Sequence, residues 1–162
     1  MGKIVISENV SLDGVIQDPA GDEGFRLGGW VGGAKFAARW PSRSGELADR
    51  INSLPKYVVS STLENPDWKN STVLKGDVVN EVSRLKHELN GEIVVWASFQ
   101  LVRTLMEHNL VDELRLKIYP VVLGAGERLF GKTSDKKPMR LVGTQTVDGD
   151  VAFLTYERVR DA

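Results

Sequence analysis

The 162-residue chain contains no cysteine, which excludes disulfides, thiolate zinc sites and cysteine nucleophiles. Its charge is balanced, with 21 basic against 22 acidic residues, so no broad attraction to nucleic acid or to anionic lipid is expected. No uncharged apolar run is long enough to span a bilayer. The opening segment "MGKIVISENVS" predicts a strand rather than a signal peptide. We therefore expect a cytoplasmic protein with no nucleic-acid or membrane partner.

Familiar catalytic motifs are also missing. The sequence has no HExxH zinc motif, no nucleophile elbow and no Ser-His-Asp arrangement. The only two histidines, His87 and His108, are not in metal-ligand spacing, so no metal site is predicted. What remains is ordinary globular composition, 41% hydrophobic and 27% charged, which predicts a single domain over residues 1–162.

Strand-like and helix-like patterns alternate along the chain. Such alternation predicts an α/β fold with right-handed crossovers and a mostly parallel sheet. The last two strands flank a turn at 148–150, which predicts an antiparallel hairpin. Asp77 and Ser98 are expected to cap the helices that follow them. Strands are predicted over 3–10, 55–63, 70–76, 92–97, 112–123 and twice within 139–159, and helices over 34–40, 44–54, 77–91 and 99–110.

The junction at 97–101, "ASFQL", leads from a buried strand into a helix. A helix N-terminus exposes unpaired N–H groups and the positive end of the helix dipole, so it can hold a phosphate. The alternative is that Ser98 only caps the helix while Phe99 packs against a neighbour. Ser60 and Ser61 follow another strand, where hydroxyls either bind phosphate or form a turn.

Two glycine-containing segments complete the candidates. Asp13 stands beside Gly14 near the end of the first strand, where a carboxylate could position a substrate or relay a proton, although Asp-Gly is most often only a turn. Gly124 and Gly126 follow a later strand and could let the backbone approach a ligand. The glycine-rich loop 17–33 lacks a predicted element, and loops of this length are usually functional or mobile.

The segments "VSLDGVI", "INSLPKYVVSSTLENPDW", "LVRTLMEHNLVDELRL" and "PVVLGAGERLF" occur in this order. Over residues 3–157 the chain thereby resembles the dihydrofolate reductase-like family that includes the C-terminal reductase domain of bacterial RibD. The resemblance implies a three-layer α/β fold, with a mostly parallel central sheet and an antiparallel C-terminal hairpin. It also implies a homodimer that uses NADPH to reduce a small pterin-like or pyrimidine-like substrate.

The resemblance implies roles for particular residues. Asp13 would be catalytic. The cofactor would be bound by Ser60, Ser61 and Thr62 near the adenosine 2′-phosphate, and by Ala97, Ser98, Phe99, Gln100 and Leu101 near the pyrophosphate. The substrate would lie against Ser11, Leu12, Gly14, Trp30, Trp40, Gly124 and Gly126.

The chain departs from its relatives in two places. Relatives commonly have glycines where Ala97 and Phe99 stand. Between "GGWVGG" and "AKFAARWP" they also carry a segment of the type "LLLGRxTYE", which supplies an Arg-Thr pair to the cofactor and one strand to the sheet. Its loss is expected to weaken the cofactor site, or to leave a gap that a neighbouring chain covers, and to expose a sheet edge.

Three hypotheses about function follow. The first is an NADPH-dependent reductase of the RibD C-terminal type, acting on a substrate like 5-amino-6-(5-phosphoribosylamino)uracil, as in riboflavin biosynthesis. The second is a non-catalytic ligand-binding or interaction protein that keeps the fold with a degraded cofactor site. The third is a true dihydrofolate reductase, which is disfavoured because the usual acidic substrate anchor on a following helix is absent.

Overall fold

The computed structural model describes residues 1–31 and 44–160. The predicted helix over 34–40 and the candidate Trp40 lie outside the described residues. Within them, every predicted strand and the other three predicted helices are present, with shorter bounds except for the first strand, which is one residue longer. The strands are β1 Lys3–Ser11, β2 Lys56–Val59, β3 Ser71–Leu74, β4 Glu92–Trp96, β5 Glu113–Tyr119, β6 Met139–Val147 and β7 Val151–Arg158, and the helices are α2 Glu46–Ser53, α3 Val78–Glu88 and α4 Phe99–Glu107.

Five strands form the central sheet, in the order β4-β1-β5-β7-β6. β1 pairs in parallel with β4 and β5, while β7 pairs antiparallel with β5 and β6. The turn between β6 and β7 has positive φ at Asp148 and Gly149, as tight hairpin turns require. The predicted α/β architecture with an antiparallel C-terminal hairpin is confirmed.

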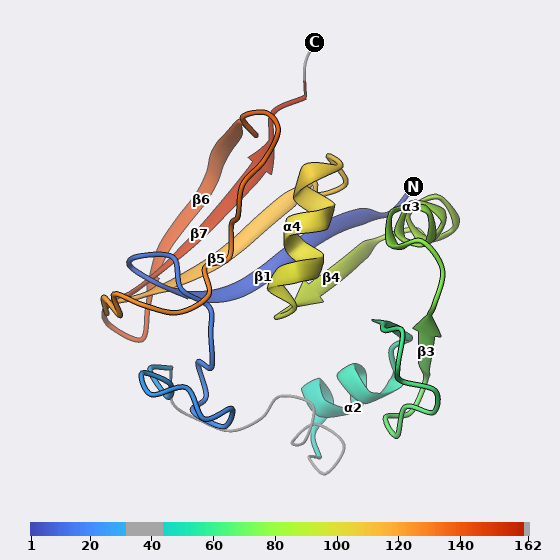
Figure 1. Ribbon diagram of the computed structural model, residues 1–162, viewed down its shortest axis with the longest axis horizontal. Helices are drawn as coiled ribbons and strands as arrows, with labels where there is room; N and C mark the ends of the chain where they lie inside the picture. Colours follow the sequence, from blue (N-terminus) through green and yellow to red (C-terminus); the bar gives the residue numbers. More distant parts are fainter. Residues whose placement is uncertain (32–43, 161–162) are drawn as a thin grey trace.

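The core lies between one face of this sheet and the helices α3 and α4 (Figure 1). Alternate residues of β1 point to the same face, so Ile4, Ile6 and Val10 pack together. Against them lie Val82 of α3 and Leu105 of α4. Both helices are amphipathic, and burial of their apolar faces holds them against the sheet.

The opposite face of the sheet carries charged side chains at the amino ends of the parallel strands. Lys3 of β1 forms an ion pair with Glu113 of β5. Arg115 forms two ion pairs, one from its Nε to Glu113 and one from its Nη2 to Glu92, each with an N–O distance of 2.5 Å. These pairs run across three adjacent strands, because Glu92 is the register partner of Lys3, and Glu113 stands opposite Val5, two residues further along β1 on the same face. This end of the sheet is therefore a structural ion-pair network.

A buried ion pair joins the core helix α3 to the sheet. Lys86 pairs with Asp112, and both side chains are 8% exposed. The Asp112 carboxylate also accepts from the Ile4 N–H at 2.8 Å and from Arg160 at 2.8 Å. Because one carboxylate holds four segments, this cluster fixes the amino end of β1 against α3, β5 and the chain after β7.

The strands β2 and β3 pair in parallel as a separate two-stranded sheet. Figure 1 shows β3 and α2 set apart from the five-stranded sheet, beyond the edge that β4 forms. Within the described residues β4 pairs only with β1. Among these residues β4 is therefore an edge strand of the central sheet, and the loss of a strand relative to the family stays a prediction. Among the described residues, no helix has the length and apolar character needed to cross a membrane.

Candidate active site

The first part of the site is the turn at the end of β1. Ser11 is 1% exposed, and its hydroxyl donates to Asp13 Oδ1 at 2.6 Å while accepting from the Val15 N–H at 2.9 Å. Gly14 has a φ of 81°, the left-handed conformation that favours glycine. Because Ser11 is buried and already bonded on both sides, it shapes the turn, while Leu12 is 61% exposed beside it.

Asp13 joins this turn to the loop after β5. Its carboxylate accepts from the Leu123 N–H at 3.2 Å and from the Gly124 N–H at 2.8 Å. The Ser11 hydroxyl, followed by these N–H groups, lowers the pKa of Asp13 to about 2. An acid of this strength is ionised near neutral pH, so Asp13 can orient groups but cannot donate a proton there. A catalytic role for Asp13 stays a prediction.

The loop after this turn is organised by Asp18, which sequence reasoning missed. Asp18 is 2% exposed and accepts from the N–H groups of Asp22, Glu23 and Phe25 at 2.7, 3.1 and 3.2 Å. Burial raises the pKa of Asp18, but these N–H groups together with that of Gly21 lower it more, so the net shift is downward. As predicted, residues 18–29 form neither a helix nor a strand, and the Asp18 carboxylate holds this loop through its hydrogen bonds. An aspartate followed by several glycines was the available signal.

Trp30 and the glycine loop close around this region. The Trp30 Nε1 donates to the Gln17 carbonyl at 3.0 Å, and its ring meets Tyr119 edge-on at 5.8 Å between centroids. A Cβ on Gly126 would lie 2.9 Å from Phe25 and 2.9 Å from Val15. Gly124 has open space around it. The structure thus brings Ser11–Gly14, Trp30 and the 124–126 loop together at the carboxyl ends of β1 and β5, as expected of one site.

The second part of the site is the junction between β4 and α4. Both Ala97 and Ser98 are left-handed, with φ of 54° and 58°. Ser98 stands at the N-cap position, but its side chain makes no capping hydrogen bond, so the prediction of a serine cap is wrong. The reason is the backbone: a capping hydroxyl needs an extended N-cap residue, and Ser98 is not extended.

This junction presents unpaired backbone donors. The first intrahelical bond runs from the Val102 N–H to the Ser98 carbonyl. The N–H groups of Phe99, Gln100 and Leu101 precede it, and as first-turn donors they have no carbonyl four residues back within the helix. Such donors, together with the helix dipole, fit a phosphate group.

The Phe99 side chain packs against the core as a partly buried residue. The Arg103 guanidinium lies over its ring, 4.9 Å from the centroid. Phe99 is therefore part of the helix's attachment to the sheet, which was one of the two interpretations of this residue.

A buried carboxyl group lies beside the same junction and was also missed. Glu8 of β1 is 9% exposed. Burial is the larger influence and raises its pKa to about 8, although the Ala97 N–H hydrogen-bonds the carboxylate and acts in the opposite direction. The signal in the sequence was a lone acidic residue between Ile6 and Val10, on the buried face of a strand.

The third part is the turn after β2. The Ser60 hydroxyl accepts from the N–H groups of Thr62 at 3.2 Å and Leu63 at 3.0 Å. Ser60 thus forms a local turn, which was the simpler of its two interpretations. Ser61 and Thr62 are exposed. These three residues belong to the β2–β3 sheet, so they are not joined to the β4–α4 junction by continuous strand pairing.

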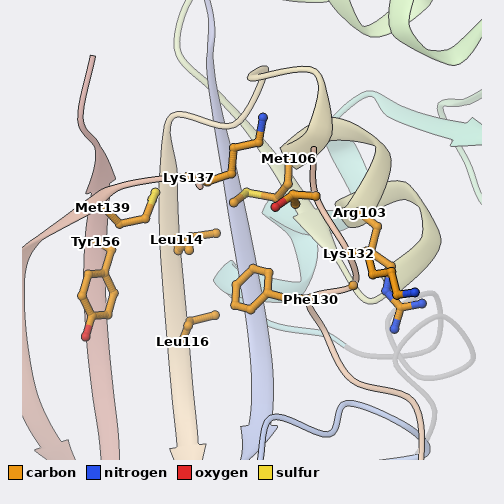
Figure 2. A pocket seen from close by; sticks show the side chains of 11 residues that line it. Arg103, Met106, Leu114, Leu116, Phe130, Lys132, Lys137, Met139 and Tyr156 are labelled. Atoms are coloured by element: carbon orange, nitrogen blue, oxygen red, sulfur yellow. The ribbon is translucent and has the colours of Figure 1, made fainter. Parts of the chain in front are cut away.

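A cavity of about 330 Å³ lies elsewhere, between α4, β5, β7 and the chain after Phe130. Figure 2 shows Leu114 and Leu116 on its floor, with Tyr156 and Met139 on one side and Phe130 opposite. None of the sequence-predicted site residues that the structure describes lines this cavity. In the described chain no group of three or more His, Cys, Asp or Glu side chains could hold a metal ion.

Comparisons with known proteins identify the chain's relatives. The family profile of the RibD C-terminal domain matches residues 30–153. The uncharacterised protein YyaP of Bacillus subtilis is 32% identical over 116 residues, which cover 72% of this chain and 61% of YyaP. The chain therefore spans less than two thirds of this relative's length.

Solved structures share the fold. A putative riboflavin biosynthesis protein from Shewanella superposes with a TM-score of 0.68 at 19% identity, covering 98% of this chain and 99% of that one. A pyrimidine reductase-like protein from Corynebacterium diphtheriae gives 0.64 at 15% identity over 99% and 93%. Dihydrofolate reductase from Enterococcus faecalis, complexed with NADP(H), gives 0.58 at 13% identity over 97% and 96%.

Proposed function

Because the chain belongs to the RibD C-terminal domain family, we propose that it is an NADPH-dependent reductase of a small pterin-like or pyrimidine-like substrate. The observation that carries the proposal is the family match over residues 30–153, which takes in both the β4–α4 junction and the 124–126 loop. The neighbour that is named pyrimidine reductase-like supports the substrate class. The dihydrofolate reductase that holds NADP(H) supports the cofactor.

The three parts of the site would have different roles. The donors that follow Ser98 would hold the pyrophosphate, while the exposed Ser61 and Thr62 would approach the 2′-phosphate. NADPH, when bound, would supply a hydride to the carbon of a C=N bond or of a sugar carbonyl. Asp13 would keep the β1 turn against Gly124, so that the substrate and nicotinamide meet in a fixed geometry.

Titration of the protein with NADPH, followed by cofactor fluorescence, tests this proposal. We expect saturable binding at micromolar to millimolar cofactor. Ser98→Trp should weaken binding at least about tenfold, because an indole at the helix N-terminus occupies the space of a phosphate. Thr144→Trp, at an exposed position of β6, is the matched control and should bind as the parent does. No binding to the parent at millimolar NADPH contradicts the proposal.

Turnover then separates the reductase from a second candidate, a non-catalytic ligand-binding protein that keeps the fold. The separation of β2–β3 from the central sheet favours this candidate, because it splits the two phosphate subsites. NADPH oxidation with a pyrimidine substrate of the 5-amino-6-ribosylaminouracil class supports the reductase. Oxidation only with dihydrofolate identifies a dihydrofolate reductase, and binding without any oxidation supports the non-catalytic protein.

Cytoplasmic location and a homodimer are part of the same proposal. The balanced charge and the absence of cysteine agree with a reducing compartment. A second copy that pairs with the exposed edge of β4 would extend the central sheet. Sedimentation of the NADPH-loaded protein at several concentrations tests the dimer, and a monomer at every concentration contradicts it.

A further inference from the structure

Glu8 is the buried titratable group that the proposed reaction does not use. It is 9% exposed. Within the part of the chain that the structure describes, its Oε1 is buried without a hydrogen-bond partner. A buried carboxylate oxygen without a donor is rare and costly, because its hydration is lost without replacement. The position therefore calls for an explanation.

The backbone places this side chain at the β4–α4 junction. Ser7 is paired with Trp96, the last residue of β4, so Glu8 stands beside Ala97. Along β1, Glu8 shares the face of Ile6 and Val10, which pack in the core with Val102 of α4. The carboxyl group thus lies on the side of the sheet that α4 covers, and the Ala97 N–H hydrogen-bonds to it.

Among residues 1–31 and 44–160, no charged side chain compensates Glu8. Its neighbour in the register on β5 is Leu116. Burial and the Ala97 N–H are the two influences on its pKa, with no ionic partner among them. On α4 the nearest cation in sequence to the junction is Arg103, which is engaged with Glu127, the Arg128 carbonyl and the Phe99 ring. A carboxyl group so placed is neutral over the range where most carboxyl groups are ionised.

We infer that Glu8 is a proton-controlled determinant of phosphate binding at the β4–α4 junction. In its neutral form it holds the Ala97 N–H and leaves the helix N-terminus free for the cofactor's pyrophosphate. In its ionised form its negative charge interacts with the positive end of the helix dipole in place of the ligand, and it repels the ligand's phosphates. The inference rests on one part of the proposed function, namely that the β4–α4 junction binds the phosphates of the ligand.

The test measures the dissociation constants of NADPH and of ADP between about pH 7 and about pH 9, where the phosphates of both probes change little in charge. ADP carries a diphosphate without a nicotinamide, so it reports the junction alone. For the parent protein we expect affinity for both probes to fall about tenfold over this range. Glu8→Gln should bind as tightly as the parent near pH 7 and lose this pH dependence.

Glu107→Gln is the matched control. Glu107 is the last residue of α4, where its carboxylate accepts from the Ser134 N–H. It is a glutamate of the same helix layer, far from the junction, and the Ser134 hydroxyl and N–H hold its pKa below its usual range. It therefore stays ionised throughout, and its removal should leave the slope of affinity against pH unchanged.

The outcomes separate the two proposals. Identical pH dependence in the parent and in Glu8→Gln overturns the role of Glu8, whether or not the enzyme oxidises NADPH. A pH dependence for ADP that Glu8→Gln abolishes supports that role, even where no substrate is reduced and the reductase function fails. Absence of binding of both probes to both proteins at every pH overturns both proposals.

Discussion

Two carboxyl groups, one on β1 and one in the turn that follows it, meet opposite environments. Asp13, in the turn, accepts three hydrogen bonds, from Ser11, Leu123 and Gly124, and its pKa falls to about 2. Glu8, five residues earlier, is buried with one oxygen unpartnered among the described residues, and its pKa rises to about 8. The residue type is nearly the same, so the difference comes from the donors and the water that each site provides.

This contrast assigns different work to the two ends of the candidate site. The Asp13 end is a preorganised anionic turn, in which the carboxylate fastens two loops together. The Glu8 end contains a carboxyl group that is neutral near pH 7 and lies beside a helix N-terminus. Of these two carboxyl groups, only Glu8 holds a proton near neutral pH, whereas Asp13 is ionised there.

The variant Glu8→Gln, which removes the titratable group with the raised pKa, is expected to have the largest effect on stability. The pKa of Glu8 is raised from 4.5 to about 8. Between these two pH values the side chain is ionised in the unfolded state but neutral in the folded state, so the folded state loses stability as the pH rises. Above about pH 8 both states are ionised, and the loss stays constant. At about pH 7 the variant should gain up to about 3 kcal/mol in the free energy of unfolding, at about 1.4 kcal/mol per pKa unit.

Urea denaturation of both proteins across the pH range provides the measurement. The difference should vanish near about pH 4, where both side chains are neutral. A variant that is no more stable than the parent near neutral pH, while its fluorescence and circular dichroism remain native, would show that Glu8 is ionised in the folded protein.

A second variant probes how tightly the Asp13 end is packed. Gly126→Ala places a Cβ at 2.9 Å from both Phe25 and Val15, at a φ of 113°. We expect a loss of about 2–3 kcal/mol, which combines the backbone strain with the clash. Gly124→Ala also has positive φ but meets open space, so its loss should be about 1 kcal/mol. Equal losses in thermal or urea unfolding would mean that the 124–126 loop does not rest against the β1 turn.

A third variant tests the backbone strain at the junction. Ala97 is left-handed, which costs a residue with a Cβ about 1–2 kcal/mol, part of which is offset by the greater chain entropy of glycine. Ala97→Gly should therefore stabilise the protein by about 0.5–1 kcal/mol in urea denaturation. Ala152→Gly, in β7, where φ is not in the left-handed region, is the comparison and should lose about 0.5–1 kcal/mol. A destabilised Ala97→Gly protein would show that the left-handed junction is not populated.

The smallest effect near neutral pH is expected for Asp13→Asn, since water reaches this site and the amide oxygen can still accept a hydrogen bond. Its main consequence lies in acid. The lowered pKa of Asp13 means that its stabilisation is present above about pH 4 and is lost as the pH falls through about 2. Thermal unfolding between these values should show a steeper loss in the parent than in the variant. Parallel curves would contradict the pairing of Asp13 with the 123–124 amides.

The order of elements could be predicted from the sequence because hydrophobic periodicity and turn residues agree there. The Asp77 cap accepts from the Asn80 N–H at 3.0 Å, and the hairpin turn is at 148–150, both as the local chemistry requires. The division into two sheets was harder to foresee in detail. Strand patterns state which residues are apolar, whereas pairing depends on neighbours that are distant along the chain.

The site divides in the same way. The Ser11–Gly14 turn, the Trp30 region and the Gly124–Gly126 loop could be predicted to share one edge, because strand ends in a parallel sheet converge. The roles of Glu8 and Asp18 could not. Each depends on which backbone N–H groups come within reach in three dimensions, and those groups carry no signal of residue type.

The position of β1 between two later strands also has a consequence for synthesis of the chain. β1 is made before both of its partners, β4, which begins at Glu92, and β5, which begins at Glu113. Its apolar residues Ile4, Val5 and Ile6 are all 0% exposed in the folded protein. During synthesis they lack their partner strands until residues 92–119 have been made. During this interval they are an exposed β-branched segment, which makes chaperone dependence and translation speed the quantities that limit the yield of native protein.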